Sequence, residues 1–232
     1  MPQNPLIVAL DTDDRARLAG WAEDLGPVVG LLKVGLQAHT ALGPAVVADV
    51  AAHAPVFLDL KLHDIPNTVA GAAAAAADAG IAMLTVHASG GPAMVAAAAE
   101  AAPDVAILAV TVLTSLDDGG LAAVGQPPAD EQVPRLARMA VEAGATGIVC
   151  AAAEVTAVRA AVGADPLVVV PGIRPARPGA QPDDQARTAT PRAALDAGAS
   201  HLVVGRPVTT AADPVVAARA ILREVGGTAD VE

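Results

Sequence analysis

The sequence predicts an α/β fold, a single (β/α)₈ TIM barrel, because short apolar runs alternate eight times with Ala-rich segments long enough to be helices. The core is expected to be aliphatic: 53% of the 232 residues are hydrophobic, yet there is no Tyr, one Phe and one Trp. Such side chains suit parallel strands that are buried on both faces. A doubly wound open sheet is the alternative, but the turn after the first run reads A-L-D-T-D-D instead of the Gly-rich dinucleotide pattern.

The barrel is expected to span residues 1–232 as one domain, with 226–232 as a frayed tail. The expected strands are residues 6–11, 31–36, 56–62, 83–87, 106–113, 147–150, 167–170 and 201–205. The expected helices are residues 13–25, 43–52, 68–79, 92–101, 131–143, 153–162, 190–197 and 213–225. Helix N-caps are predicted at Asp13, Thr190 and Asp213, and helix C-terminal glycines at Gly80, Gly144 and Gly198.

The composition indicates which classes of partner the protein can bind and in which compartment it is expected. A net charge of −11 argues against nucleic acid and anionic membranes, and an anionic small substrate would need cations placed locally in its site. Cys150 is the only cysteine, so no intramolecular disulfide can form; it ends an apolar run, which predicts a buried structural thiol. The N-terminus lacks signal-peptide features, and no apolar stretch reaches the ~20 residues that span a bilayer. A cytoplasmic protein is expected.

The segment V-F-L-D-L-K-L-H-D-I-P-N-T, residues 56–68, places charges inside a run that should otherwise be core. With the two-residue period of a strand, Asp59 and Lys61 share one face with Phe57, and three leucines share the other. Burying these ions costs several kcal/mol each unless they are paired. A pair that only fixes the strand register is the simpler interpretation, but the third charge, Asp64, just past the strand favours a catalytic site.

Other polar residues stand at the predicted strand ends, which meet at one face of such a barrel, where its chemistry takes place. They are Asp11, Lys33, Thr114, Arg174 and Arg206, the last directly after Gly205. Each alone has an ordinary interpretation, such as a helix cap or a surface charge. Together they predict a site, because independent placement of so many polar groups on one face is improbable.

The last two strand-to-helix connections predict a phosphate site. Backbone N–H groups around Gly205, a helix start and the Arg206 guanidinium would form a preorganised anion pocket. Residues 174–190 form a long Pro- and Gly-rich connection, which is either a lid over the site or a surface insertion.

The motifs D-L-K-L-H-D-I-P-N-T, A-L-D, K-V-G, L-T-S, P-G-I-R with its later D-Q, and V-G-R-P-V together resemble the orotidine 5′-phosphate decarboxylases over essentially the whole chain. The resemblance implies conversion of orotidine 5′-monophosphate to uridine 5′-monophosphate without a cofactor or metal, by a homodimer with shared active sites. The D-x-K-x-x-D core alone is less specific, since sugar-phosphate aldolases and decarboxylases of the same barrel group carry a similar pattern and use Mg²⁺.

The resemblance also implies roles for the matching residues. Lys61 would protonate C6 of the pyrimidine, flanked by Asp59 and by Asp64, the latter reaching with Thr68 into the neighbouring subunit's site. Lys33 and Asp11 would bind the ribose, with Lys33 completing the charge network. The remaining ligand contacts would come from Thr114, near the base, and from Arg174, Gln185, Gly205 and Arg206, with Gln185 and Arg206 closing on the phosphate.

Three points stay open at the level of sequence. The stretch between Arg174 and the D-Q is slightly longer than usual, so Gln181 competes with Gln185 for the lid position, although the D-Q-x-R-x-x-T-P context favours Gln185. A Mg²⁺-dependent aldolase or decarboxylase of the same group is one alternative function. A sugar-phosphate-binding barrel without turnover is another, but it leaves Lys61 unexplained.

Overall fold

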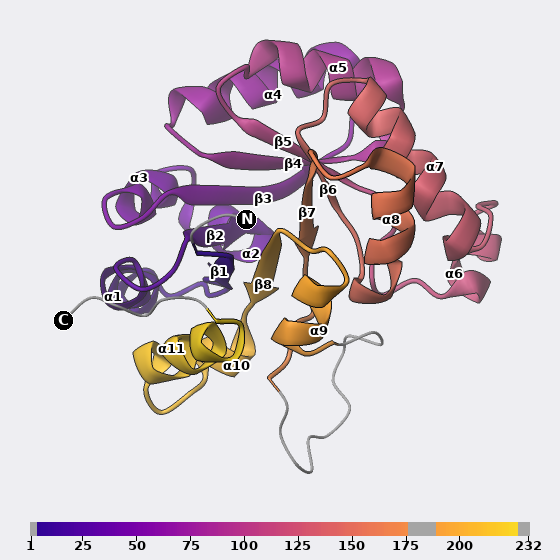
Figure 1. Cartoon of the computed structure of the whole chain (residues 1–232). Coiled ribbons are helices and arrows are strands. Elements are labelled where there is room, and N and C mark those ends of the chain that lie inside the picture. Colours follow the sequence, from indigo (N-terminus) through magenta and orange to yellow (C-terminus); the bar gives the residue numbers. More distant parts are fainter. Residues whose placement is uncertain (1–3, 176–188, 227–232) are drawn as a thin grey trace.

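Eight parallel strands close into a barrel in chain order, β1 to β8, with the helices packed around the outside (Figure 1). This computed structural model describes residues 4–175 and 189–226. The strands are β1 (Leu6–Ala9), β2 (Leu31–Gly35), β3 (Val56–Leu62), β4 (Met83–His87), β5 (Ala106–Val110), β6 (Gly147–Val149), β7 (Leu167–Val170) and β8 (His201–Val204). The predicted barrel is therefore confirmed, and the open-sheet alternative is wrong because β1 pairs with β8.

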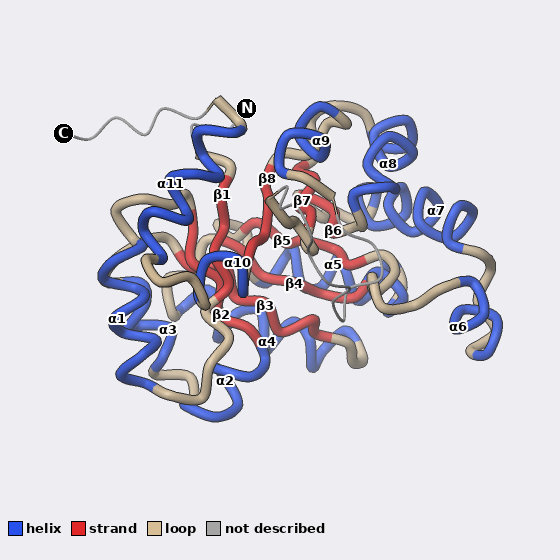
Figure 2. Tube along the Cα trace, turned by 90° about the horizontal axis from the view of Figure 1, so that it is seen from below, coloured by secondary structure: helices blue, strands red, loops and turns tan. Residues whose placement is uncertain are grey.

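The helices form a layer around the ring of strands, as the perpendicular view also shows (Figure 2). They are α1 (Arg15–Leu25), α2 (Leu36–Leu42), α3 (Val46–Ala51), α4 (Pro66–Asp78), α5 (Pro92–Ala101), α6 (Asp118–Ala123), α7 (Ala129–Glu142), α8 (Val155–Val162), α9 (Pro191–Asp196), α10 (Arg206–Thr209) and α11 (Pro214–Glu224). Short 3₁₀ turns, η1 (Ala88–Gly90) and η2 (Ala152–Glu154), precede α5 and α8. Within the described ranges, no helix is both long and apolar enough to cross a membrane.

Mostly aliphatic side chains fill both layers of the core, as the composition predicts. The cluster inside the barrel consists of Ile7, Ala9, Leu31, Phe57, Met83, Leu108, Val110, Val149, Val169 and Val203. Alternate residues of the same strands, such as Val8 and Leu58, face outward and pack with the helices in the larger cluster. This alternation confirms the predicted faces of residues 56–62, since Phe57 points inward and Leu58 outward.

The register of the first three strands brings polar residues together above the inner cluster. Lys33 lies beside Ala9 of β1 and Phe57 of β3, and Gly35 lies beside Asp59. Between β3 and β4 the register shifts, because Leu58 pairs with Leu84 but Leu62 pairs with Val86. The paired positions are therefore four residues apart on β3 but two residues apart on β4. This irregularity coincides with the charged end of β3.

Helix ends follow the predicted signals with one exception. Thr190 and Asp213 cap α9 and α11, accepting hydrogen bonds from Ala193 and Val216 N–H groups. The predicted cap at Asp13 is wrong: Asp14 caps α1, because its carboxylate accepts from the N–H groups two and three residues later. The predicted terminal glycines, Gly80, Gly144 and Gly198, do follow their helices with positive φ angles of 74°, 99° and 110°.

Several predicted boundaries differ from the structure. β1 ends at Ala9 rather than at residue 11, and β5 ends at Val110 rather than at residue 113. Residues directly beyond these strands, such as Leu10, Thr111 and Val112, are still buried, so periodicity alone does not reveal where pairing stops. The short helices α2, α6 and α10 were not predicted, since each is seven residues or fewer. The expected tail, 226–232, lies outside the described residues except for Gly226.

Candidate active site

A cavity of about 490 Å³ opens at the C-terminal ends of the strands. A volume of this size is typical of small-molecule sites. Its polar walls are made of residues from the ends of β1, β2, β3, β5, β7 and β8 and from the segments that follow them. Polar lining residues are Asp11, Lys33, Gln37, Asp59, Lys61, Thr114, Arg174, Arg206 and Thr209.

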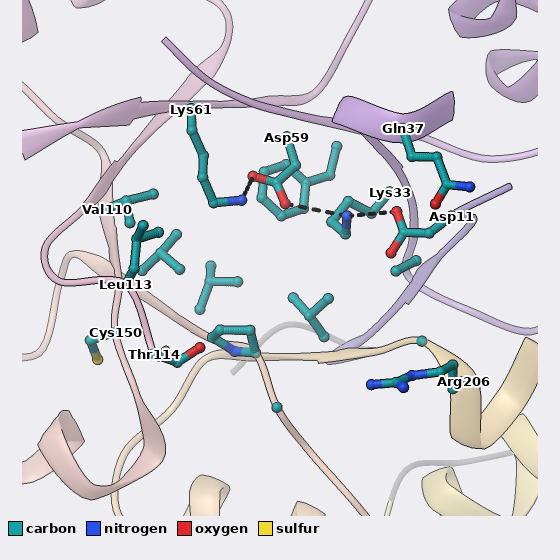
Figure 3. Close-up of a pocket in the computed structure, with 18 of the residues that line it drawn as sticks. Asp11, Lys33, Gln37, Asp59, Lys61, Val110, Leu113, Thr114, Cys150 and Arg206 are labelled. Atoms are coloured by element: carbon teal, nitrogen blue, oxygen red, sulfur yellow. Dashed lines mark hydrogen bonds and ion pairs between the residues drawn. The ribbon is translucent and has the colours of Figure 1, made fainter. Parts of the chain in front are cut away.

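Four charged side chains lie in a row of alternating sign along one wall of the cavity (Figure 3). The Lys61 ammonium is 2.7 Å from Asp59 Oδ1, and the Lys33 ammonium is 3.2 Å from Asp59 Oδ2. Lys33 also lies 3.3 Å from Asp11 Oδ1. Each oxygen of Asp59 therefore faces a different cation. Ion pairs thus fix the order Asp11–Lys33–Asp59–Lys61, here called the charge row, whose members come from β2, β3 and the segment after β1.

Burial and pairing act in opposite directions on the central groups. Burial of Asp59 disfavours its charged form, but the charges of Lys33 and Lys61 and hydrogen bonds from Lys61 and Thr85 outweigh burial and lower the pKa of Asp59. Burial of Lys33 disfavours the ammonium, yet Asp59 and Asp11 raise the pKa of Lys33 above its usual value. The carboxylate and the ammonium are both charged at neutral pH, although each residue is less than a tenth exposed.

Gly35 leaves room for the Lys33–Asp11 pair. A Cβ atom on Gly35 would lie 2.6 Å from Asp11 Oδ1 and 2.8 Å from Lys33 Nζ. These distances are too short for non-bonded atoms, so a larger residue would displace one of the two charged groups. The glycine in K-V-G is thus required by close approach of side chains, since its own φ of −94° is open to any residue.

Lys61 has an unusual backbone for its position in β3. Its φ of +51° places it in the left-handed region, which residues other than Gly seldom adopt. Its N–H donates to Thr85 Oγ1 on β4 at 2.9 Å. The hydroxyl of Thr85 in turn donates to Asp59 Oδ1, also at 2.9 Å. Sequence reasoning missed Thr85, because T-V-H in β4 has the pattern of an ordinary strand.

The opposite side of the cavity carries the remaining predicted residues. Thr114 and Arg206 lie across from the charge row, with Arg206 at the start of α10 (Figure 3). Arg174 and Gly205 also line the cavity. The N–H of Arg174 donates to the carbonyl of Ala189, which joins the two ends of the long connection after β7. The structure thus brings Thr114, Arg174, Gly205 and Arg206 to the same cavity as the charge row.

Two of the described predicted residues, Asp64 and Thr68, do not line this cavity. Asp64 and Thr68 are exposed, beyond the end of β3 and in the first turn of α4, and neither lines the cavity formed by the described residues. Gln185 and its competitor Gln181 lie outside the described residues, as does most of the predicted lid, 174–190.

Gln37 and Thr209 line the cavity but were not predicted. Gln37 lies beside Lys33 and Asp11 (Figure 3). It follows K-V-G by two residues, but a polar residue in an expected strand-to-helix connection is too common to be a signal. Cys150 is buried as predicted, and burial raises the pKa of its thiol. An uncharged thiol is a poor nucleophile, which agrees with the structural interpretation of Cys150.

Among the described residues, no group of three or more His, Cys, Asp or Glu side chains is placed to hold a metal ion. The two carboxylates of the charge row have the Lys33 ammonium between them instead. The fold and the site define a (β/α)₈ barrel with a lysine–aspartate network at the C-terminal ends of its strands. Such a network presents fixed positive charge to any negative charge that develops in the cavity.

Comparison with known proteins narrows this class. Residues 4–221 match the family described as "Orotidine 5'-phosphate decarboxylase / HUMPS family". The orotidine 5′-phosphate decarboxylase of Anaeromyxobacter dehalogenans (strain 2CP-1) is 58% identical over 223 residues, covering 95% of this chain and 97% of the relative. That of Thermobifida fusca (strain YX) is 55% identical over 227 residues, covering 97% of each chain. This chain belongs to the orotidine 5′-phosphate decarboxylase / HUMPS family.

Solved structures agree with this assignment. The crystal structure of orotidine 5′-phosphate decarboxylase from Lactobacillus acidophilus superposes with a TM-score of 0.83 at 38% identity. The match covers 96% of this chain and 99% of that one. The predicted family resemblance is therefore confirmed.

Proposed function

We propose that this protein decarboxylates orotidine 5′-monophosphate to uridine 5′-monophosphate and CO₂, the last step of de novo uridylate synthesis. One observation carries the proposal: Asp59 is held between the ammonium groups of Lys33 and Lys61 at the edge of the cavity. The proposal is supported by the relatives named orotidine 5′-phosphate decarboxylase, which align over almost the whole chain.

The reaction breaks the bond between C6 and the carboxylate carbon, and the electron pair stays on C6. This carbanion lies in the plane of the ring, where π delocalisation gives little help, so fixed charge must stabilise it. The Lys61 ammonium faces the developing carbanion, donates its proton to C6 and completes uridylate. Its attraction for that charge is stronger in a cavity from which water is excluded.

Asp59 orients Lys61 and also crowds the departing carboxylate. Two like charges about 4 Å apart repel by about 4 kcal/mol at an effective dielectric of about 20. Enzymes lower barriers by up to about 23 kcal/mol, so this repulsion is an accessory contribution. The larger contributions come from the preorganised charges and from binding energy of the remote phosphate, which is used to exclude water.

Substrate binding is assigned to the rest of the cavity. Asp11 and Lys33 bind ribose hydroxyls, and Thr114 lies near the base. The phosphate group is assigned to backbone N–H groups around Gly205 and to the Arg206 guanidinium, with Arg174 completing the ligand site and Gln185 joining when the connection after β7 closes. A guanidinium gives the phosphate charge-assisted hydrogen bonds. Arg206 lies across the cavity from the charge row, so phosphate and reacting carbon would occupy opposite ends (Figure 3).

A Mg²⁺-dependent aldolase is the second candidate, and the position of Lys33 argues against it. The Lys33 ammonium lies within 3.3 Å of carboxylate oxygens of both Asp11 and Asp59. A divalent cation bound by these carboxylates would meet Lys33 at close range, and like charges in a buried site repel strongly.

The direct test follows the absorbance of orotidine 5′-monophosphate with purified protein, with and without EDTA. We expect conversion to uridine 5′-monophosphate and CO₂ at the same rate in both samples. Loss of activity in EDTA that Mg²⁺ restores would favour the aldolase. Complete lack of turnover would favour a sugar-phosphate-binding protein.

A further part of the proposal is a cytoplasmic homodimer with shared sites; the exposed positions of Asp64 and Thr68 leave both side chains accessible to a second subunit. Asp64 and Thr68 would complete the site of the partner, while Asp11, Lys33 and the rest of the charge row serve their own chain. Lys61→Ala and Asp64→Ala dimers should each be nearly inactive.

Mixing these two variants distinguishes sites that are shared between subunits from sites that each chain forms alone. A mixed dimer places both lesions in one site and leaves the other intact. Random exchange should therefore regain roughly a quarter of wild-type activity, since about half the dimers are mixed and each has one good site. If Asp64 serves its own chain, no activity returns. Mass-tagged chains report whether exchange has occurred.

A further inference from the structure

Thr85 closes a ring of hydrogen bonds behind the charge row. It lies in the middle of β4 and is fully buried. Its Oγ1 accepts from the N–H of Lys61 and donates to Asp59 Oδ1, both at 2.9 Å. The same Asp59 oxygen accepts from the Lys61 ammonium at 2.7 Å. The ring therefore runs from the backbone of Lys61 through Thr85 and Asp59 to the end of the Lys61 side chain.

The backbone of Lys61 needs such support. Among the described residues, Lys61 is the only one other than Gly with a positive φ. Left-handed backbone is unfavourable for an L-residue, and it persists only where surrounding contacts fix it. The register shift between Leu58 and Leu62 removes regular pairing with β4 at this point. The hydroxyl of Thr85 takes the place of a backbone acceptor for the Lys61 N–H.

We propose that Thr85 is a positioning residue, whose hydroxyl holds Lys61 in its left-handed conformation and orients Asp59 toward the Lys61 ammonium. Thr85 acts through its neighbours, since it is absent from the cavity wall formed by the described residues. A hydroxyl suits this place because it accepts one hydrogen bond while it donates another. The inference rests on the proposed function, since it assigns Lys61 to the reaction.

Thr85→Val tests the hydroxyl while keeping the shape of the side chain. The variant leaves the Lys61 N–H without its acceptor and Asp59 Oδ1 without one donor. Thr85→Ser keeps the hydroxyl and serves as rescue. Thr111→Val is the matched control, because Thr111 is another buried threonine of the barrel, but its hydroxyl donates only to the carbonyl of Val149.

We expect Thr85→Val to lower kcat about 100-fold, as small displacements of a reacting group do, with KM changed by no more than about threefold. The acid limb of its pH–rate profile should move to higher pH, because Asp59 loses a hydrogen bond that favours its charged form. Thr85→Ser and Thr111→Val should keep kcat within about fivefold of wild type. A kcat for Thr85→Val within that range, or no rescue by Thr85→Ser, would overturn the proposal.

Amide hydrogen exchange at Lys61 gives a measurement that needs no turnover. The wild-type and Thr85→Ser proteins should protect this amide, and Thr85→Val should lose the protection. Rapid exchange in the wild type would overturn the proposal even if the valine variant fails to fold. If the wild type does not turn over orotidine 5′-monophosphate, the proposed function fails, and amide exchange alone then decides whether Thr85 holds the Lys61 backbone.

Discussion

Replacing Lys33 by Met tests whether the charge row works as a unit. Lys33 lies 3.2 Å from Asp59 Oδ2, and opposite unit charges at this distance attract by about 5 kcal/mol at an effective dielectric of about 20. The desolvation of the ammonium offsets part of this attraction. The Asp11 side chain is 50% exposed, so its share is screened and counts for little.

We expect Lys33→Met to lower the free energy of unfolding by about 3 kcal/mol, because removing one partner leaves a buried charge short of compensation. The pKa of Asp59 should rise, since burial remains and one of its two cations is gone. Decarboxylation should lose at least about 100-fold in kcat/KM, which corresponds to about 3 kcal/mol of transition-state stabilisation. The acid limb of the pH–rate profile should therefore move to higher pH.

Chemical denaturation and the absorbance assay measure these effects. Arg15→Met provides the control, since it also removes a cation from an ion pair, at 2.7 Å from Asp49, but the Arg15 side chain is 55% exposed. This control should change stability by less than about 1 kcal/mol and leave kcat unchanged. If Lys33→Met keeps kcat/KM within about threefold of wild type, the charge row does not act as proposed.

Three further changes probe separate parts of the molecule. Lys61→Ala should leave a folded protein without measurable decarboxylation, and about a tenth of the wild-type rate would contradict its role. Arg206→Ala should lower kcat/KM about 100-fold for the nucleotide but scarcely for the nucleoside without phosphate, and equal losses would contradict phosphate binding. Burial lowers the pKa of His201 to about 4, so stability is lost as pH falls from about 6.5 toward 4, by about 3 kcal/mol. The free energy of unfolding of His201→Leu, measured by denaturation across this pH range, should not show that loss.

The period of two along β3 was enough to predict which side chains face the cavity. It placed Asp59 and Lys61 on the face of Phe57, and the structure has Phe57 inside the barrel with both charges above it. The strand ends then located Asp11 and Lys33, because parallel strands of a closed barrel end at one face. Hydrophobic alternation is a local pattern, so it can be recognised in the sequence without knowledge of the strand register.

What the sequence does not contain is the pairing between strands. The shift between β3 and β4 depends on how Leu58 and Leu62 align with β4, and no local pattern specifies it. The left-handed backbone of Lys61 and its contact with Thr85, 24 residues later, follow from that shift. Gly35 was recognised only as part of a motif, since the reason for it is the distance between two side chains that converge from different strands.

The same pairing explains how the site holds charged groups away from water. Asp59 accepts from Lys61 and Thr85 at one oxygen and faces Lys33 at the other, so its charge is compensated by groups on three strands. The folding free energy of the barrel therefore offsets the unfavourable burial of these ions and the strain at Lys61. Because this cost is met during folding, substrate binding need not arrange the charges. In the proposed reaction, a preorganised site of this kind would stabilise the carbanion as it forms, since its charges would not have to reorient.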